Sequence, residues 1–207
     1  MNNSKNLEIE RKFLLPDVSG INLKKLKPIK ILQGYLGFNP VVRVRISDQG
    51  CFLGVKGPGT ISRLEIEKEI TKKEANQLME ISTGKIQKTR YKIPHEKHIW
   101  EIDIFEGYLK GLHLAEIELK SEKEKFTLPD FMKRSIEVSD NPQLTNAQLS
   151  VFSPDFLKES VLAPYLDCAT CGIVTKWNWN DDHSLLHCHC CNKQAAGNTK
   201  SLLVKLS

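Results

Sequence analysis

Eight short segments with alternating polar and apolar residues follow one another through the first 120 residues of the chain. Successive side chains of a β-strand point to opposite faces, so this alternation predicts strands rather than helices. The segments are residues 7–15, 29–37, 41–47, 51–57, 62–70, 85–93, 98–107 and 112–120. Turn-forming stretches such as SDQG and GPGT separate several of them. Eight short strands at this spacing favour a closed antiparallel barrel over an open sheet.

Two other segments are expected to contribute flanking helices. The stretch TKKEANQLMEIS predicts a helix that begins at Thr71, with Glu74 completing a capping box. Residues 121–134 are expected to start with one helical turn and to break near Pro129. The expected fold class is therefore mainly β (α+β), an eight-stranded barrel with flanking helices.

The charged residues of six predicted strands are sorted by sign. Arg43 and Arg45 share one face of VVRVRIS, whereas Glu116 and Glu118 share one face of AEIEL. For any single strand, a solvated face explains such charges, but solvated faces usually mix the two signs. Sorting over six strands is expected if the apolar faces point outward and the charged faces point inward, which makes the barrel a tunnel.

An inward ring of arginine and lysine fits an oligophosphate, because guanidinium groups match pairs of phosphate oxygens. An adjoining ring of carboxylates needs a positive partner. Hard divalent cations such as Mg²⁺ or Mn²⁺ bind carboxylate oxygens and bridge to phosphates. The net charge of +5, from 30 basic and 25 acidic residues, suits an anionic ligand but is too small to indicate nucleic acid.

The order of several short motifs resembles the CYTH family, the triphosphate tunnel metalloenzymes. The motifs are ExExK as Glu8-Ile9-Glu10-Arg11-Lys12, QGYL at 33–36, VRVR at 42–45, VKG at 55–57, SRLEIE at 62–67, KTRY at 88–91, EIDIF at 101–105 and AEIEL at 115–119. The resemblance covers about residues 5–150. It implies a tunnel that hydrolyses inorganic triphosphate or thiamine triphosphate or, in one branch, cyclises ATP.

The element order is more similar to the inorganic triphosphatase branch of the family. The expected activity is therefore metal-dependent hydrolysis of inorganic triphosphate or a related triphosphate compound, with Mg²⁺ or Mn²⁺ in the tunnel. Two alternatives remain open at this point. One is an adenylate cyclase on the same fold, and the other is a non-catalytic module that binds polyphosphate or a nucleotide.

The resemblance also implies roles for individual residues. The metal ligands would be Glu8, Glu10, Glu116 and Glu118, with Glu65, Glu67 and Asp103 in supporting roles. The phosphate-binding set would be Lys12, Arg43, Arg45, Lys56, Arg63, Lys88 and Arg90. Lys12 and Tyr35 match a lysine–tyrosine pair implicated in catalysis in the inorganic triphosphatase branch. One departure is visible, because Gln143 and Leu144 stand where the family's closing segment has Arg-Tyr.

Cysteine is concentrated near the C-terminal end of the sequence. Cys51 stands alone, whereas the other five cysteines lie between residues 168 and 191. Cys168, Cys171, Cys188 and Cys191 have the paired C-x₂-C spacing of a zinc ribbon. His187, His189 and Cys190 compete for the fourth ligand position. The pattern predicts a structural Zn²⁺ in a small C-terminal tail.

These features divide the chain into a tunnel domain (1–150), a connector helix (151–166) and a zinc-ribbon-like tail (167–207). No run approaches the ~18 apolar residues of a membrane span, and the N-terminus lacks a signal-peptide pattern. We therefore expect a cytoplasmic protein whose partner is a small-molecule triphosphate, without membrane or nucleic acid. A homodimer is left open, and no partner for the ribbon is indicated.

Overall fold

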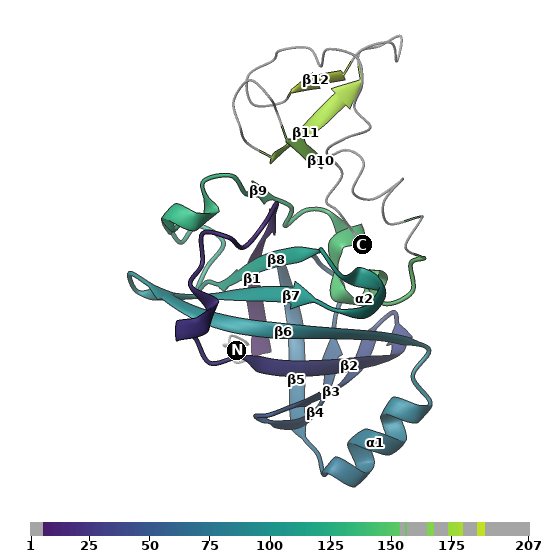
Figure 1. The fold of residues 1–207 in the computed structure, drawn as a ribbon. Helices are drawn as coiled ribbons and strands as arrows, with labels where there is room; N and C mark the ends of the chain where they lie inside the picture. The colour runs from purple at the N-terminus through teal and green to yellow at the C-terminus, as the bar shows by residue number, and fades with distance from the viewer. Residues whose placement is uncertain (1–5, 154–155, 157–164, 168–173, 180–185, 189–207) are drawn as a thin grey trace.

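The computed structural model describes residues 6–153, 156, 165–167, 174–179 and 186–188. Its main part is a closed antiparallel barrel (Figure 1). The barrel strands are β1 (Leu7–Leu15), β2 (Ile29–Phe38), β3 (Val41–Ser47), β4 (Gly50–Lys56), β5 (Ser62–Glu69), β6 (Gly84–His95), β7 (His98–Phe105) and β8 (His113–Glu118). All eight expected strands are confirmed, each within a few residues of its expected bounds.

The strands follow the order β5-β4-β3-β2-β6-β7-β8-β1, and β1 closes the circle by pairing with β5. Leu7 pairs with Leu64 at the closure, and from Glu10 onward β1 pairs with β8. The two-residue strand β9 (Ile136–Glu137) adds to the far half of β1. Closure removes the unpaired edges that an open sheet would leave.

The helix α1 (Lys72–Glu80) covers the outside of β2, β3 and β4. Thr71 is the N-cap of this helix, and its hydroxyl accepts a hydrogen bond from the backbone N–H of Glu74. The expected capping box is confirmed. Ala75 and Met79 of α1 pack against Val44 of β3. Figure 1 shows α1 outside the barrel, beside β3 and β4.

A second outer cluster lies over β1, β7 and β8. The ring of Trp100 packs edge-to-face on Phe13 and on Phe126, with ring centroids 5.4 Å and 5.8 Å apart, respectively. The helical turn expected at the start of residues 121–134 is wrong, because Ser121 and Glu124 form only an isolated hydrogen-bonded turn. The chain that follows is neither helix nor strand and brings Phe126 onto the rings of Phe13 and Trp100.

The outer apolar face near the closure is not covered by the described residues. Leu7, Leu64 and Ile66 point outward from β1 and β5 and remain 52%, 53% and 42% exposed. Among the described residues, α1 covers the outward face of β2–β4, and Met132 of a short helical turn packs in the cluster over β1, β7 and β8.

One end of the barrel is filled by apolar side chains. The short helices η5 (Pro142–Leu144) and α2 (Asn146–Leu149) bring Leu144 and Leu149 against Leu14, Tyr35 and Phe105. The interior is thus apolar at this end and charged further along. Three further single-turn helices connect strands: η2 (Leu23–Lys25), η3 (Gly107–Leu109) and η4 (Asp130–Met132).

The C-terminal region contains a separate antiparallel sheet. Its strands are β10 (Tyr165–Asp167), β11 (Val174–Trp179) and β12 (Leu186–Cys188). Cys188 ends β12, whereas the predicted zinc ligands Cys168, Cys171 and Cys191 lie outside the described residues, as does most of the predicted connector helix. In the part of the chain that the structure describes, no helix has the length and apolar character needed to cross a membrane.

Candidate active site

Inward-facing side chains of the barrel strands line a cavity of about 1020 Å³. The alternation of β1 directs Glu8, Glu10 and Lys12 into this cavity, while Ile9 and Phe13 pack on the outside. The same charged stripe that resembles a solvated face in the sequence is therefore an inner wall of the barrel.

Most of the predicted site residues are brought together here. Those that line the cavity are Glu8, Glu10, Lys12, Tyr35, Arg43, Arg45, Lys56, Arg63, Glu65, Glu67, Arg90, Glu116 and Glu118. Lys88 and Asp103 do not line it. Both of their side chains are fully buried and form an ion pair with each other.

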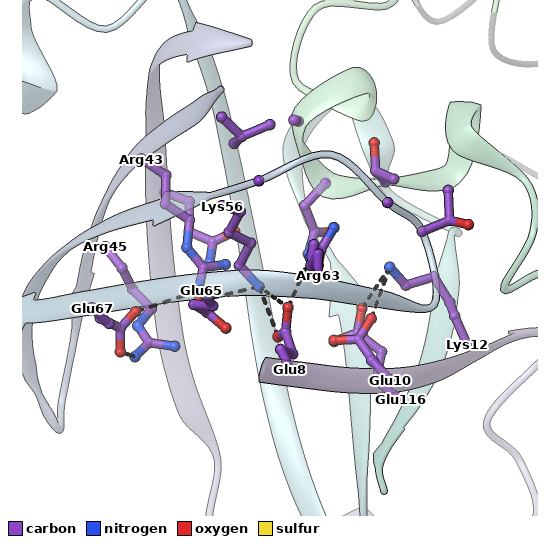
Figure 2. Close-up of a pocket in the computed structure, with 18 of the residues that line it drawn as sticks. Glu8, Glu10, Lys12, Arg43, Arg45, Lys56, Arg63, Glu65, Glu67 and Glu116 are labelled. Atoms are coloured by element: carbon purple, nitrogen blue, oxygen red, sulfur yellow. Dashed lines mark hydrogen bonds and ion pairs between the residues drawn. The ribbon is translucent and has the colours of Figure 1, made fainter. Parts of the chain in front are cut away.

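Glu8 joins two cations at the point where β1 meets β5. The Lys56 ammonium donates to both carboxylate oxygens of Glu8 at 2.8 Å, and Arg63 Nε donates to one of them at 2.8 Å. Figure 2 shows Lys56 and Arg63 converging on this carboxylate. Burial acts to raise the pKa of Glu8, but Lys56 and Arg63 outweigh it and lower the pKa to about 2.

The two arginines of β3 are held by the glutamates of β5. Arg43 Nη2 lies 3.0 Å from Glu65 Oε1 and 3.3 Å from Glu67 Oε1, and Arg45 Nη2 lies 2.7 Å from Glu67 Oε2. The strand β4 lies between β3 and β5, and its Gly54 pairs with Arg43 on one side and with Glu67 on the other. Because glycine has no side chain, the arginine can reach across β4 to the glutamates. In this structure Glu65 and Glu67 are counter-ions of arginines.

Lys12 lies between carboxylates of β1 and β8. Its ammonium is 3.2 Å from Glu10 Oε1 and 3.1 Å from Glu116 Oε1. Burial acts to lower the pKa of Lys12, but Glu10 and Glu116 raise it above the ordinary value. Its backbone N–H donates to Ser139 Oγ at 2.9 Å, which ties this part of β1 to the segment after β9. Lys12 is therefore a fixed positive charge at neutral pH.

Arg90 on β6 contacts three carboxylates at once. Its Nε and Nη2 donate to the two oxygens of Asp103 at 2.6 Å each, and Nη2 also donates to Glu116 Oε2 at 2.7 Å. Its Nη1 donates to Glu101. Burial acts to raise the pKa of Glu116, but Lys12, Lys88 and Arg90 hold it well below the ordinary value.

Tyr35 lies where the charged cavity meets the apolar end of the barrel. Its side chain is buried, and its hydroxyl donates to Gln33 Oε1 at 3.2 Å. Burial raises the pKa of Tyr35 above its ordinary value, and the nearby Arg43 and Lys12 do not offset this. The phenol is therefore neutral at physiological pH.

The carboxylates of β1, β7 and β8 suit a divalent cation by their chemistry, because all of them are hard oxygen donors. Burial and the neighbouring Glu101, Glu8 and Glu10 raise the pKa of Glu118, a crowding of like charges that a cation would relieve. Glu116 Oε1 is buried and faces the Lys12 ammonium at 3.1 Å. A smaller cavity of about 340 Å³ adjoins these side chains.

In the described part of the chain, no three such side chains converge closely enough to hold a metal ion as they stand. The ion pairs account for this, because Glu8 is held by Lys56 and Arg63 and Glu116 is held by Lys12 and Arg90. Metal binding therefore requires some of these pairs to separate.

The cavity residues that the sequence-based prediction did not include are represented by Glu101, Lys92 and Gln33. Glu101 and Lys92 face the cavity next to Arg90, and Gln33 accepts the hydrogen bond of Tyr35. Glu101 lies two residues before Asp103 on the same face of β7, so strand alternation alone contains the signal for it. Gln33 has no charge to distinguish it in the pattern.

Comparisons with known proteins give a consistent result. The family described as the CYTH domain matches residues 6–148. An inorganic triphosphatase of Acetivibrio thermocellus is 44% identical over 148 residues, which cover 69% of this chain and 92% of that protein. An inorganic triphosphatase of Nitrosomonas europaea is 32% identical over 158 residues, which cover 71% of this chain and 99% of that protein.

Among solved structures, a crystal structure of an inorganic triphosphatase aligns with a TM-score of 0.52 and 28% identity. The alignment covers 71% of this chain and 96% of that one. The family match ends at residue 148, so the similarity concerns the barrel and the helices at its end.

Proposed function

Because the chain belongs to the CYTH family, whose domain spans residues 6–148, we propose that it is a divalent-metal-dependent triphosphatase. The substrate is inorganic triphosphate or a related triphosphate compound, hydrolysed inside the barrel. The observation that carries the proposal is the cavity wall, where a group of arginines and lysines adjoins a group of carboxylates. The two relatives described above are both inorganic triphosphatases, which supports the same substrate class.

The cationic side chains are proposed to bind the phosphate groups. Arg43 and Arg45 have guanidinium groups that match phosphate oxygens in pairs, and Lys56 and Arg63 extend the positive charge to β1. Each is paired with a glutamate in this structure. A triphosphate takes the place of those carboxylates, so the protein presents a prearranged set of anion positions.

We propose that Glu10, Glu116 and Glu118, together with Glu8, hold the divalent cation, Mg²⁺ or Mn²⁺. When bound, this cation offsets the charge of the phosphate oxygens and lowers the pKa of the attacking water. The Arg and Lys side chains hold the phosphate chain in line for attack.

The roles of Lys12 and Tyr35 follow from their protonation. Lys12 stays charged because of Glu10 and Glu116, so it stabilises negative charge on the phosphate and does not act as a base. Tyr35 stays neutral in its buried position, which favours a hydrogen-bonding role over proton abstraction. We assign both to positioning and charge stabilisation.

The alternatives of a cyclase and of a non-catalytic binding module are less well supported. Both relatives are triphosphatases rather than cyclases. A module that only binds a polyanion needs the cationic wall but not the cluster of Glu10, Glu116 and Glu118.

A phosphate-release assay tests the proposal. Inorganic triphosphate, thiamine triphosphate, ATP and longer polyphosphate are each incubated with Mg²⁺, with Mn²⁺ or with a chelator, and cyclic AMP is measured in parallel. We expect metal-dependent phosphate release from triphosphate. Glu116→Gln should lower the rate by about a hundredfold or more, since it removes a ligand charge from the metal site.

Glu80→Gln is the matched control, because Glu80 is exposed at the end of α1, outside the barrel. Its rate should equal that of the wild type. Full activity of Glu116→Gln, or of the wild type in chelator, would contradict the metal-dependent mechanism. Cyclic AMP without phosphate release would favour the cyclase.

We also propose that the C-terminal tail binds one structural Zn²⁺ through Cys168, Cys171, Cys188 and Cys191. The support is the spacing of the four cysteines in the sequence. A cytoplasmic location would agree with such a set of reduced thiols.

A further inference from the structure

One end of the cavity is bordered by an uncharged rim. Three segments form this neutral rim, residues 38–41, 57–60 and 142–148, and within the described chain every residue of these segments that lines the cavity is uncharged. The segments lie together, because Val41 pairs with Lys56 at the end of β4 and packs against the cluster at the barrel end. Phosphate groups pair best with the cations further along the cavity wall. The neutral rim therefore suits an uncharged part of a ligand.

Phe38 reaches the neutral rim because of an irregularity in β2. Strict alternation would place Phe38 on the strand face opposite to Tyr35, which lines the cavity. However, the register of β2 against β3 shifts between Tyr35 and Gly37, so that Phe38 pairs with Val41 and lines the cavity as well. Bulges of this kind often redirect a side chain next to an active site.

Phe38 keeps an exposed aromatic surface at this position. Its ring stacks on that of Tyr35, with centroids 6.2 Å apart and an interplanar angle of 22°. Tyr35 is 1% exposed, whereas Phe38 is 36% exposed. An aromatic ring that is supported from behind and exposed beside a cavity can stack on a flat ring of a ligand.

The amide of Asn146 adds a polar group to the neutral rim. Asn146 lines the cavity, and its Oδ1 is buried without a hydrogen bond within the described residues. A buried acceptor without a partner costs free energy, so no contact among these residues opposes a turn of the amide toward a ligand. An amide both donates and accepts, which matches the mixed polar edge of a heterocycle. The backbone on either side is fixed by the buried Leu144 and Leu149.

We propose that the neutral rim binds the organic group of a triphosphate ester, with an aromatic heterocycle that stacks on Phe38 and hydrogen-bonds to the Asn146 amide. The phosphate chain of the same molecule extends along the cationic wall, which begins beside the rim at Lys56 and Arg63. Attack of water on the terminal phosphorus then releases the diphosphate ester and inorganic phosphate. The inference rests on the proposed function, because the cationic wall has to hold the phosphates. It adds Phe38 and Asn146 as residues that determine specificity.

The test compares substrates with and without an aromatic heterocycle. Phosphate release gives kcat/KM for ATP and thiamine triphosphate, which have one, and for inorganic triphosphate and ribose triphosphate, which do not. Phe38→Leu removes the aromatic ring and keeps an apolar side chain, and Asn146→Ala removes the amide. Phe156→Leu is the matched control, because Phe156 is 41% exposed and does not line the cavity.

We expect Phe38→Leu to lower kcat/KM for ATP and for thiamine triphosphate by about 5- to 100-fold, the effect typical of losing one stacking contact. The values for inorganic triphosphate and ribose triphosphate should stay within about twofold. Asn146→Ala should lower the same two values by about 3- to 10-fold, as expected for one hydrogen bond. Phe156→Leu should change none of the four by more than about twofold. Circular dichroism checks folding, and Asn146→Ala carries the test if Phe38→Leu is unfolded.

Two results for the variants would overturn the inference. An equal loss for all four substrates would mean that Phe38 and Asn146 only shape the cavity, and no loss for any would mean that the neutral rim is merely solvated. If the wild type hydrolyses inorganic triphosphate but neither heterocyclic compound, the inference fails and the proposed function stands. If it hydrolyses none of the four, the proposed function fails as well. Hydrolysis of only one heterocyclic compound would support the inference and identify which source the rim accepts.

Discussion

At the scale of single residues, the barrel interior is a set of ion pairs between potential ligands for a phosphate and potential ligands for a metal. Glu8 illustrates this, because Lys56 and Arg63 bind the carboxylate that the proposed cation also needs. These ion pairs neutralise the buried charges of the cavity while no ligand is bound. When a ligand binds, the pairs have to separate, and this separation costs free energy. Both parts of the charge pattern therefore belong to one site.

The lowered pKa of Glu8 predicts an acid-dependent loss of stability. A carboxylate with a lowered pKa in the folded state stabilises the protein above its unfolded value of 4.5, and this contribution is lost as the pH falls through the folded value of about 2. Between pH 6 and pH 3 the stability advantage of the wild type over Glu8→Gln should shrink by about 2 kcal/mol. Urea unfolding in metal-free buffer at both pH values measures it, and an advantage that does not change with pH would contradict the assigned ion pairs.

At the scale of elements, the strands could be predicted because the period of two is carried by strongly contrasting residues. Glu8, Glu10 and Lys12 alternate with Ile9 and Phe13, and the register of β1 against β8 then brings Lys12 opposite Glu116. The helix α1 could be predicted from its capping box. The alternation and the capping box are local signals that act within a few residues of the chain, whereas the register of β1 against β8 joins distant segments.

Other elements depend on contacts between distant segments and could not be predicted in this way. The segment from 121 to 134 contains helix-forming residues, but it forms no α-helix in the structure, and its Phe126 packs on Trp100 and Phe13. Likewise, the ion pairs of Asp103 depend on β6 and β7 being neighbours. The family resemblance implied a supporting role for Asp103 beside the metal ligands, whereas its side chain is fully buried and does not line the cavity.

The helical segment that closes one barrel end yields the next prediction. Leu144 is fully buried against Leu14 and Tyr35, whereas the neighbouring Gln143 is exposed. Leu144→Ala should lower the free energy of unfolding by about 2–4 kcal/mol, because it leaves a cavity in a packed cluster. Gln143→Ala should change it by less than about 0.5 kcal/mol. Denaturant unfolding compares the two, and equal effects would mean that Leu144 does not fill the barrel end.

At the scale of the whole molecule, the chain combines a barrel that matches its family with a cysteine-rich tail beyond the match. The tail strands β10, β11 and β12 pair only with one another among the described strands. Phe152, in contrast, packs against the cluster at the barrel end. A natural division between the two parts therefore follows Phe152.

We predict that a truncated chain ending at Ser153 remains folded and hydrolyses triphosphate at the rate of the full chain. All described residues that line the cavity lie before Ser150, and the truncated chain keeps the packing of Phe152 and Leu149. Metal analysis should find about one Zn²⁺ in the full chain and none in the truncated one. Cys168→Ser in the full chain should lose zinc and retain hydrolysis, since metal binding supplies the folding energy of so small a unit.

If the truncated chain loses activity, its circular dichroism spectrum and unfolding midpoint show whether it is unfolded or folded but inactive. If the truncated chain is unfolded, the tail stabilises the barrel and the proposed division into independent parts is wrong. If it is folded but inactive, the tail completes the catalytic site. Gln143 and Leu144 stand where the family has Arg-Tyr at the barrel end. In that case, side chains beyond residue 153 would take over the role of the missing arginine and tyrosine.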